Sequence, residues 1–197
     1  VNALTFLPLI PVLLSVVRVT QREIPAESRK HPFEEFKQGL GYMKGQRIIL
    51  ATMGIATAPG IFIGSGFDPF LAVYSDTVFD MGQKGYTIFL TAMGVGALIG
   101  ATALGWVGNV QWKGKMLFLG IFGYCVSTAA FAYSQSFVLS LAALTLLGFA
   151  QVVHNSSATA MLLEKVPSDM RGRIMGIFNF SRLGLRIVNG PFLAIVN

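Results

Sequence analysis

The chain has 197 residues, of which 53% are hydrophobic and only 12% are charged, and its mean hydropathy is +0.63. A soluble domain typically carries about 25% charged residues, so this composition excludes an ordinary water-soluble domain. One cysteine and two histidines provide neither an internal disulfide nor a spaced set of metal ligands, so we expect no metal and no cofactor.

Apolar residues come in long blocks separated by short polar gaps. Five blocks are about long enough to cross a ~30 Å hydrocarbon core as a helix: residues 48–73, 86–107, 116–133, 137–163 and 174–196. A sixth block, residues 3–17, is shorter. We therefore expect an all-α, polytopic transmembrane helix bundle in contact with a lipid bilayer.

Lysine and arginine collect in every second gap. Residues 18–47, 108–115 and 164–173 contain seven, two and three of them, whereas residues 74–85 contain one and residues 134–136 none. This asymmetry follows the positive-inside rule and predicts that the three basic gaps are cytoplasmic. The net charge of +6 is thus explained by membrane topology, and we expect no nucleic-acid partner.

The basic segment 18–47 is the only long polar connection. In residues 32–47, apolar side chains such as Phe36 and Leu40 recur at helical spacing. This pattern predicts a helix along the membrane surface, within a cytoplasmic loop that joins two bundles.

Small residues recur within two of the blocks. Residues 86–107 contain Gly94, Gly96, Gly100 and Gly105. Such spacing predicts closely packed transmembrane helices. In residues 48–73, Gly60, Gly64 and Gly66 precede Pro69 and predict a bendable outer half. The bend could serve gating or accommodate a neighbouring helix.

Three stretches resemble a known family. They are Gly39-Leu-Gly-Tyr42 after the basic loop, Gly85-Tyr86 through Gly94-Val-Gly-Ala-Leu-Ile-Gly100, and Pro167-x-x-x-Arg171-Gly-Arg-x-Met-Gly176. In this order they resemble the C-terminal half of a twelve-helix major facilitator superfamily transporter. The bacterial branch of enterobactin exporters and macrolide-efflux proteins is the most similar.

The resemblance implies an assignment for the whole chain. Residues 1–17 would be the end of helix six, residues 18–47 the central cytoplasmic loop, and residues 48–197 helices seven to eleven. The chain would then be a fragment that lacks helix twelve and the N-terminal half with which it pairs.

The resemblance also implies a function. It predicts a multi-pass protein of the bacterial inner membrane that exports a small amphipathic compound, drug-like or siderophore-like, by alternating access and proton coupling. The alternative is a non-transporting membrane scaffold or sensor with a degenerate transporter fold. We expect no enzyme, because no catalytic motif occurs in the chain.

Two cytoplasmic loops are candidates for a gate. The family's loop between helices eight and nine is matched by Gly105 and Asn109, where an amide replaces the expected acid. The loop before helix eleven supplies Pro167, Arg171, Gly172 and Arg173. Its arginines would either pair with the other half of the protein or only anchor the loop at the cytoplasmic surface.

A few polar residues inside the blocks are candidates for a substrate and proton pathway. Asp68 is either a proton carrier or a cap for the backbone near Pro69. Gln151, His154 and Asn155 share one helix face and would either bind substrate and relay protons or hydrogen-bond between helices.

Two arginines complete the candidates. Arg186 would attract an anion in a cavity unless helix eleven begins late, in which case it lies near the headgroups together with Arg182. Otherwise we expect Arg182 to reach the cytoplasmic surface.

Overall fold

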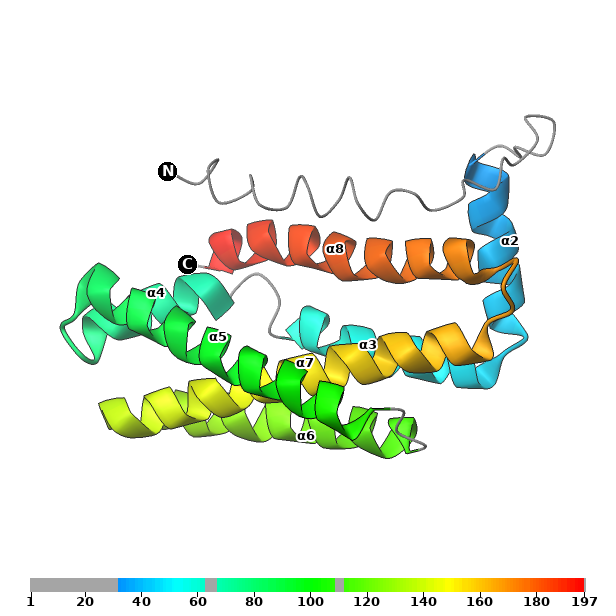
Figure 1. The fold of residues 1–197 in the computed structure, drawn as a ribbon. Helices are drawn as coiled ribbons and strands as arrows, with labels where there is room; N and C mark the ends of the chain where they lie inside the picture. The colour runs from blue at the N-terminus through cyan, green and yellow to red at the C-terminus, as the bar shows by residue number, and fades with distance from the viewer. Residues whose placement is uncertain (1–31, 63–66, 109–111, 197) are drawn as a thin grey trace, which may run out of the picture. The chain divides into compact units, whose positions relative to one another are not determined.

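The computed structural model describes residues 32–62, 67–108 and 112–196, and gives only the backbone for 32, 33, 35, 61, 62, 183 and 185–196. Every regular element in these ranges is a helix (Figure 1). They are α2 (Pro32–Lys44), α3 (Arg47–Phe62), α4 (Phe67–Thr77), α5 (Gly82–Val107), α6 (Lys113–Ala132), α7 (Phe137–Lys165) and α8 (Arg171–Val196). The all-α prediction is confirmed. The predicted segment 3–17 and residues 18–31 lie outside the described residues.

Three of the described helices are long and apolar enough to span a membrane: α5, α6 and α7. They correspond to the predicted blocks 86–107, 116–133 and 137–163. The block 48–73 was expected to be one bendable helix, and that expectation is wrong, because it holds the two shorter helices α3 and α4. Pro69 lies in the first turn of α4, where a missing backbone N–H has no helical partner to lose.

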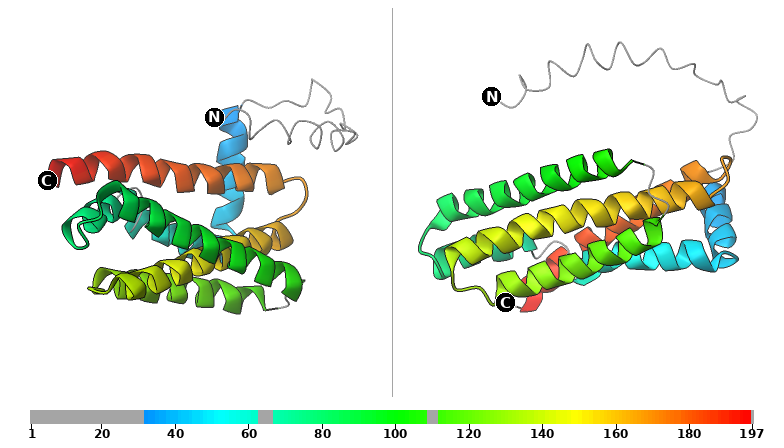
Figure 2. Two further views of the ribbon diagram at one scale, coloured as in Figure 1. Left: turned by 60° about the vertical axis from the view of Figure 1, so that its left-hand side comes forward. Right: turned by 60° about the horizontal axis from the view of Figure 1, so that its bottom comes forward.

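Helix α7 is the centre of the bundle and packs against α3, α5 and α6. Figure 2 shows α7 running between α5 and α6. A Cβ atom added at Gly96 of α5 would collide with the Thr145 carbonyl of α7, and one added at Gly148 of α7 would collide with the Met93 carbonyl of α5. These glycines therefore allow the two backbones to approach closely, as the small-residue spacing predicts.

Not every glycine of the predicted stripe contributes to this packing. Gly96 and Gly100 are buried against α7, whereas Gly94 and Gly105 face open space. The close-packed face of α5 is thus narrower than the spacing of small residues indicates.

Two apolar clusters lie at different levels along α7. One is built around Leu71, Phe89, Phe131 and Leu144 and joins α4, α5, α6 and α7. The other contains Ile49, Leu117, Leu162, Ile174 and Phe178, among others, and joins α2, α3, α6, α7 and α8. The part of α7 between Leu144 and Leu162 carries the polar residues predicted for a site.

Helix α2 confirms the helix predicted in the second half of the basic segment. It packs on α8, where the Cδ1 of Ile177 lies 2.6 Å from a Cβ built at Gly39. Arg173 of α8 also donates a hydrogen bond from Nη1 to Oε1 of Gln38 at 3.0 Å. Its location at the membrane surface stays a prediction.

Candidate functional site

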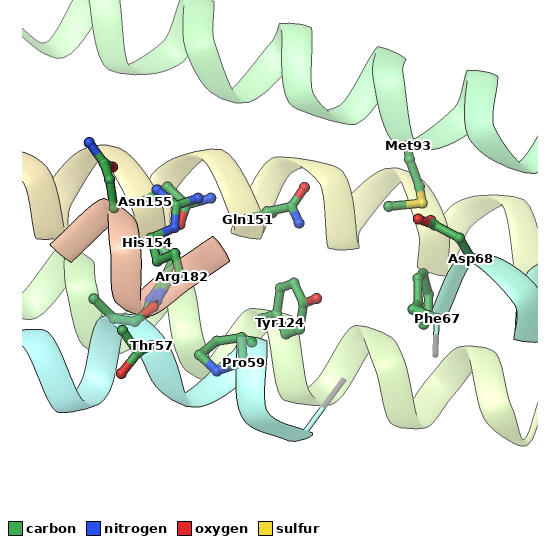
Figure 3. Close-up of a pocket in the computed structure, with 13 residues that line it drawn as sticks. Thr57, Pro59, Phe67, Asp68, Met93, Tyr124, Gln151, His154, Asn155 and Arg182 are labelled. Atoms are coloured by element: carbon green, nitrogen blue, oxygen red, sulfur yellow. Dashed lines mark hydrogen bonds between the residues drawn. The ribbon is translucent and has the colours of Figure 1, made fainter. Parts of the chain in front are cut away.

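A cavity of about 470 Å³ opens among the helices and is bordered by residues of α3, α4, α5, α6, α7 and α8. Its lining mixes apolar and polar groups (Figure 3). The polar side chains are those of Thr57, Asp68, Tyr124, Gln151, His154, Asn155, Asn179 and Arg182. Polar and ionisable groups that line a hollow beside membrane-spanning helices indicate a functional site, because hydrocarbon surroundings make such groups costly.

Helix α7 contributes the face that was predicted from residue spacing. Gln151, His154 and Asn155 all line the cavity. They are brought there because α7 is central, packs against α3 and α6, and turns one face toward the hollow that α8 also borders. Their part in substrate binding or proton transfer stays a prediction.

His154 is the most enclosed of the polar residues, with 2% of its surface exposed. Its Nε2 lies 3.4 Å from the Ala56 carbonyl oxygen of α3, which is a long hydrogen bond. Its Nδ1 is buried and has no hydrogen-bond partner within the described part of the chain. Because buried polar atoms are nearly always satisfied, this nitrogen suits a bound ligand, water or proton.

Asp68 and Arg182 place opposite charges at different ends of the cavity. In Figure 3, Asp68 lies beside Met93 and Phe67, while Arg182 lies toward His154 and Asn155. Asp68 is in the first turn of α4, and its side chain is exposed. A carboxylate near a helix N-terminus also suits the helix dipole, so its capping role and its cavity role are compatible.

Arg182 borders the cavity. Helix α8 begins at Arg171, so the alternative of a late start is wrong. Arg182 lies about 16 Å along the helix from that start, and its reach to the cytoplasmic surface stays a prediction. Its guanidinium carbon lies 5.5 Å from the ring centroid of Phe178. Arg186 belongs to α8, but its side chain lies outside the described residues.

The site also contains residues that sequence reasoning missed. Asn179 precedes Arg182 by three positions, and both line the cavity. That i, i+3 spacing of polar residues in an apolar block was a usable signal. Tyr124 gave no such signal, because an aromatic residue is common in any transmembrane helix.

The predicted gate residues have local partners. Arg171 donates from Nε to the Val166 carbonyl at 3.1 Å, and the Pro167 carbonyl accepts from the backbone N–H of Met170 at 3.0 Å. These bonds hold the turn between α7 and α8. A Cβ built at Gly172 would meet open space, as at Gly105.

Asn109 lies outside the described residues. Arg171 hydrogen-bonds within the same turn, and Arg173 hydrogen-bonds to Gln38 of α2. A gating role for these residues therefore stays a prediction. Within the described ranges, no three residues among His, Cys, Asp and Glu gather as a metal site.

Comparison with known proteins identifies the family. The family model for the Major Facilitator Superfamily matches residues 1–188 of the chain. The chain belongs to the major facilitator superfamily. Its helices are therefore those of a multi-pass membrane protein, as the composition and hydropathy predicted.

The chain is also similar to two curated proteins that have the same name in two Bacillus species. The chain is 27% identical over 192 residues to the "Putative bacilysin exporter BacE" of Bacillus subtilis, and 26% identical over 192 residues to that of Bacillus amyloliquefaciens. Each alignment covers 98% of the chain but 47% of the relative, so the chain spans about half the length of these proteins. No solved structure gives a significant match.

Proposed function

We propose that the chain corresponds to the second half of a twelve-helix superfamily fold. In this assignment α3 and α4 together form helix seven, and α5, α6, α7 and α8 are helices eight to eleven. The chain's coverage of about half of each relative supports a half-length assignment, and the order of the three motifs named above favours the second half. The N-terminal half of the parent protein would close the other side of the cavity.

The parent protein acts as a secondary active exporter of a small amphipathic compound in the bacterial inner membrane. The observation that carries this proposal is the cavity of about 470 Å³ that is lined by Asp68, His154 and Arg182 and bordered by the three helices of membrane-spanning hydropathy, α5, α6 and α7. Its apolar wall suits the apolar part of a substrate. Its amides and its two opposite charges suit the polar part.

Protons are the proposed coupling ion. Asp68 supplies a carboxylate at one end of the cavity, and His154 supplies a buried imidazole with one unpartnered nitrogen. Proton binding at these groups from outside, and release inside, would bias the rocking of the two halves around the cavity. The division of helix seven into α3 and α4 resembles the discontinuous helices that border substrate sites in other transporters.

The test is transport by inverted membrane vesicles that contain the intact parent protein. The panel starts with bacilysin, which the relatives' description names, and continues with other antibiotics and siderophores. We expect uptake of at least one compound when a pH gradient is imposed, and loss of that uptake when a protonophore collapses the gradient. Uptake that ignores the gradient would contradict proton coupling. No uptake across the panel would contradict export of these compound classes.

A further inference from the structure

A second hollow of about 350 Å³ lies outside the polar cavity and is formed by α5, α6 and α7. All its lining residues are apolar or glycine. Small residues create the space, because Ala103 of α5, Gly123 of α6 and Ala150 of α7 all border it. Larger side chains form its rim, among them Leu104, Val107 and Met116.

Basic and aromatic residues lie at one end of this hollow. Lys115 directly precedes Met116, and its Nζ lies 4.0 Å from the ring centroid of Trp112. Trp112 is 65% exposed at the start of α6. A tryptophan and a lysine at the end of an apolar helix are typical of the membrane–water boundary.

The charge balance at this end is positive. Lys113 donates from Nζ to Oε2 of Glu164 at 2.7 Å, so one of the two lysines is neutralised by an acid of α7. Lys115 forms no ion pair within the described residues. The apolar hollow therefore ends next to one uncompensated cation.

We propose that this hollow is a binding site for an anionic phospholipid. One acyl chain occupies the apolar hollow between α5, α6 and α7. The negatively charged headgroup lies at Lys115 and Trp112. The apolar lining explains why the occupant is an acyl chain, and the uncompensated lysine explains the choice of an anionic over a zwitterionic headgroup.

The geometry fits this occupant better than a polar ligand. A water-soluble anion could interact with Lys115 but would bury no apolar surface in the hollow. Met116 borders the hollow and directly follows Lys115 in the first turn of α6, so the proposed headgroup site lies at the same end of α6 as this part of the hollow.

The experiment uses the intact parent protein in detergent micelles with equal amounts of phosphatidylglycerol and phosphatidylcholine. Native mass spectrometry counts the lipids that remain bound. We expect a preference for phosphatidylglycerol that falls about fivefold in Lys115→Gln and survives in Lys115→Arg. Ala103→Leu fills the hollow and should lower the binding of both lipids.

Two matched variants serve as controls. Lys84→Gln removes an exposed lysine from the other end of α5, and Ala101→Leu enlarges an exposed alanine outside the hollow. Both should bind lipid as the unmodified protein does. Equal binding of the two lipids by the unmodified protein would overturn the proposal, as would unchanged preference in Lys115→Gln. A dimer that Ala103→Leu dissociates, without lipid preference, would show instead that a second copy covers the hollow.

Discussion

Gly120 of α6 lies directly against the backbone of His154 of α7. A Cβ atom added at Gly120 would lie 2.7 Å from the His154 backbone nitrogen and 2.8 Å from its Cα. The absence of a side chain at Gly120 therefore lets α6 approach the backbone of His154, whose imidazole lines the cavity. Packing and site geometry meet at this one contact.

Gly120→Ala should destabilise the protein and shift His154. The added methyl group meets backbone atoms, which cannot move aside as a flexible side chain can, and overpacking of this kind costs about 1–3 kcal/mol. Thermal unfolding of the purified parent protein measures the effect. The control is Gly105→Ala, which faces open space and should be neutral or slightly stabilising because alanine favours helices. Equal stability of the two variants would contradict the contact.

Gly148→Ala tests the crossing of α5 and α7. The new Cβ would collide with the Met93 carbonyl, so the two helices must separate or tilt. We expect reduced thermal stability and weaker transport, because Met93 and α7 both border the cavity. Gly94→Ala on the open side of α5 is the matched control. The crossing is wrong if both variants unfold at the temperature of the unmodified protein.

Much of the fold could be predicted because hydropathy and glycine spacing are local signals. The block 137–163 predicted α7, and the spacing of Gln151, His154 and Asn155 predicted that they share a face. The division of the block 48–73 could not be predicted in the same way. A glycine-rich apolar run permits either a bent helix or two helices, and tertiary packing decides between them.

The site was harder to predict than the fold. Arg182 borders the cavity because of how α8 packs in the bundle, and the spacing of residues within one apolar block does not specify that packing. The pair of Lys113 and Glu164 is separated by 51 positions, so only the antiparallel packing of α6 and α7 brings the two charges together.

Arg182→Gln should weaken the transport of substrates that carry a negative group. Loss of a charge-assisted hydrogen bond in a cavity raises the KM for such a substrate by about tenfold to a hundredfold. Neutral substrates should be affected much less. Arg182→Lys keeps the charge and should retain part of the activity. The same loss for neutral and anionic compounds would contradict an anion-binding role.

The predicted topology can be tested by cysteine labelling. Gln135 lies in the turn between α6 and α7, and Ser168 lies in the turn between α7 and α8. With native cysteines including Cys125 replaced, a membrane-impermeant maleimide added to intact cells should label Gln135→Cys and leave Ser168→Cys unlabelled. The reverse pattern would overturn the assignment made from the positive-inside rule.

Asp68→Asn and His154→Gln should uncouple transport from the pH gradient. Each change keeps a polar side chain of similar size in the cavity but removes an ionisable group. We expect downhill substrate movement to continue in vesicles, while the stimulation by an imposed pH gradient is lost in at least one of the variants. Asp80→Asn removes an exposed carboxylate from the turn between α4 and α5 and should leave that stimulation intact. If both cavity variants keep the full stimulation, the coupling site lies elsewhere, since the cavity would then bind substrate without the proton.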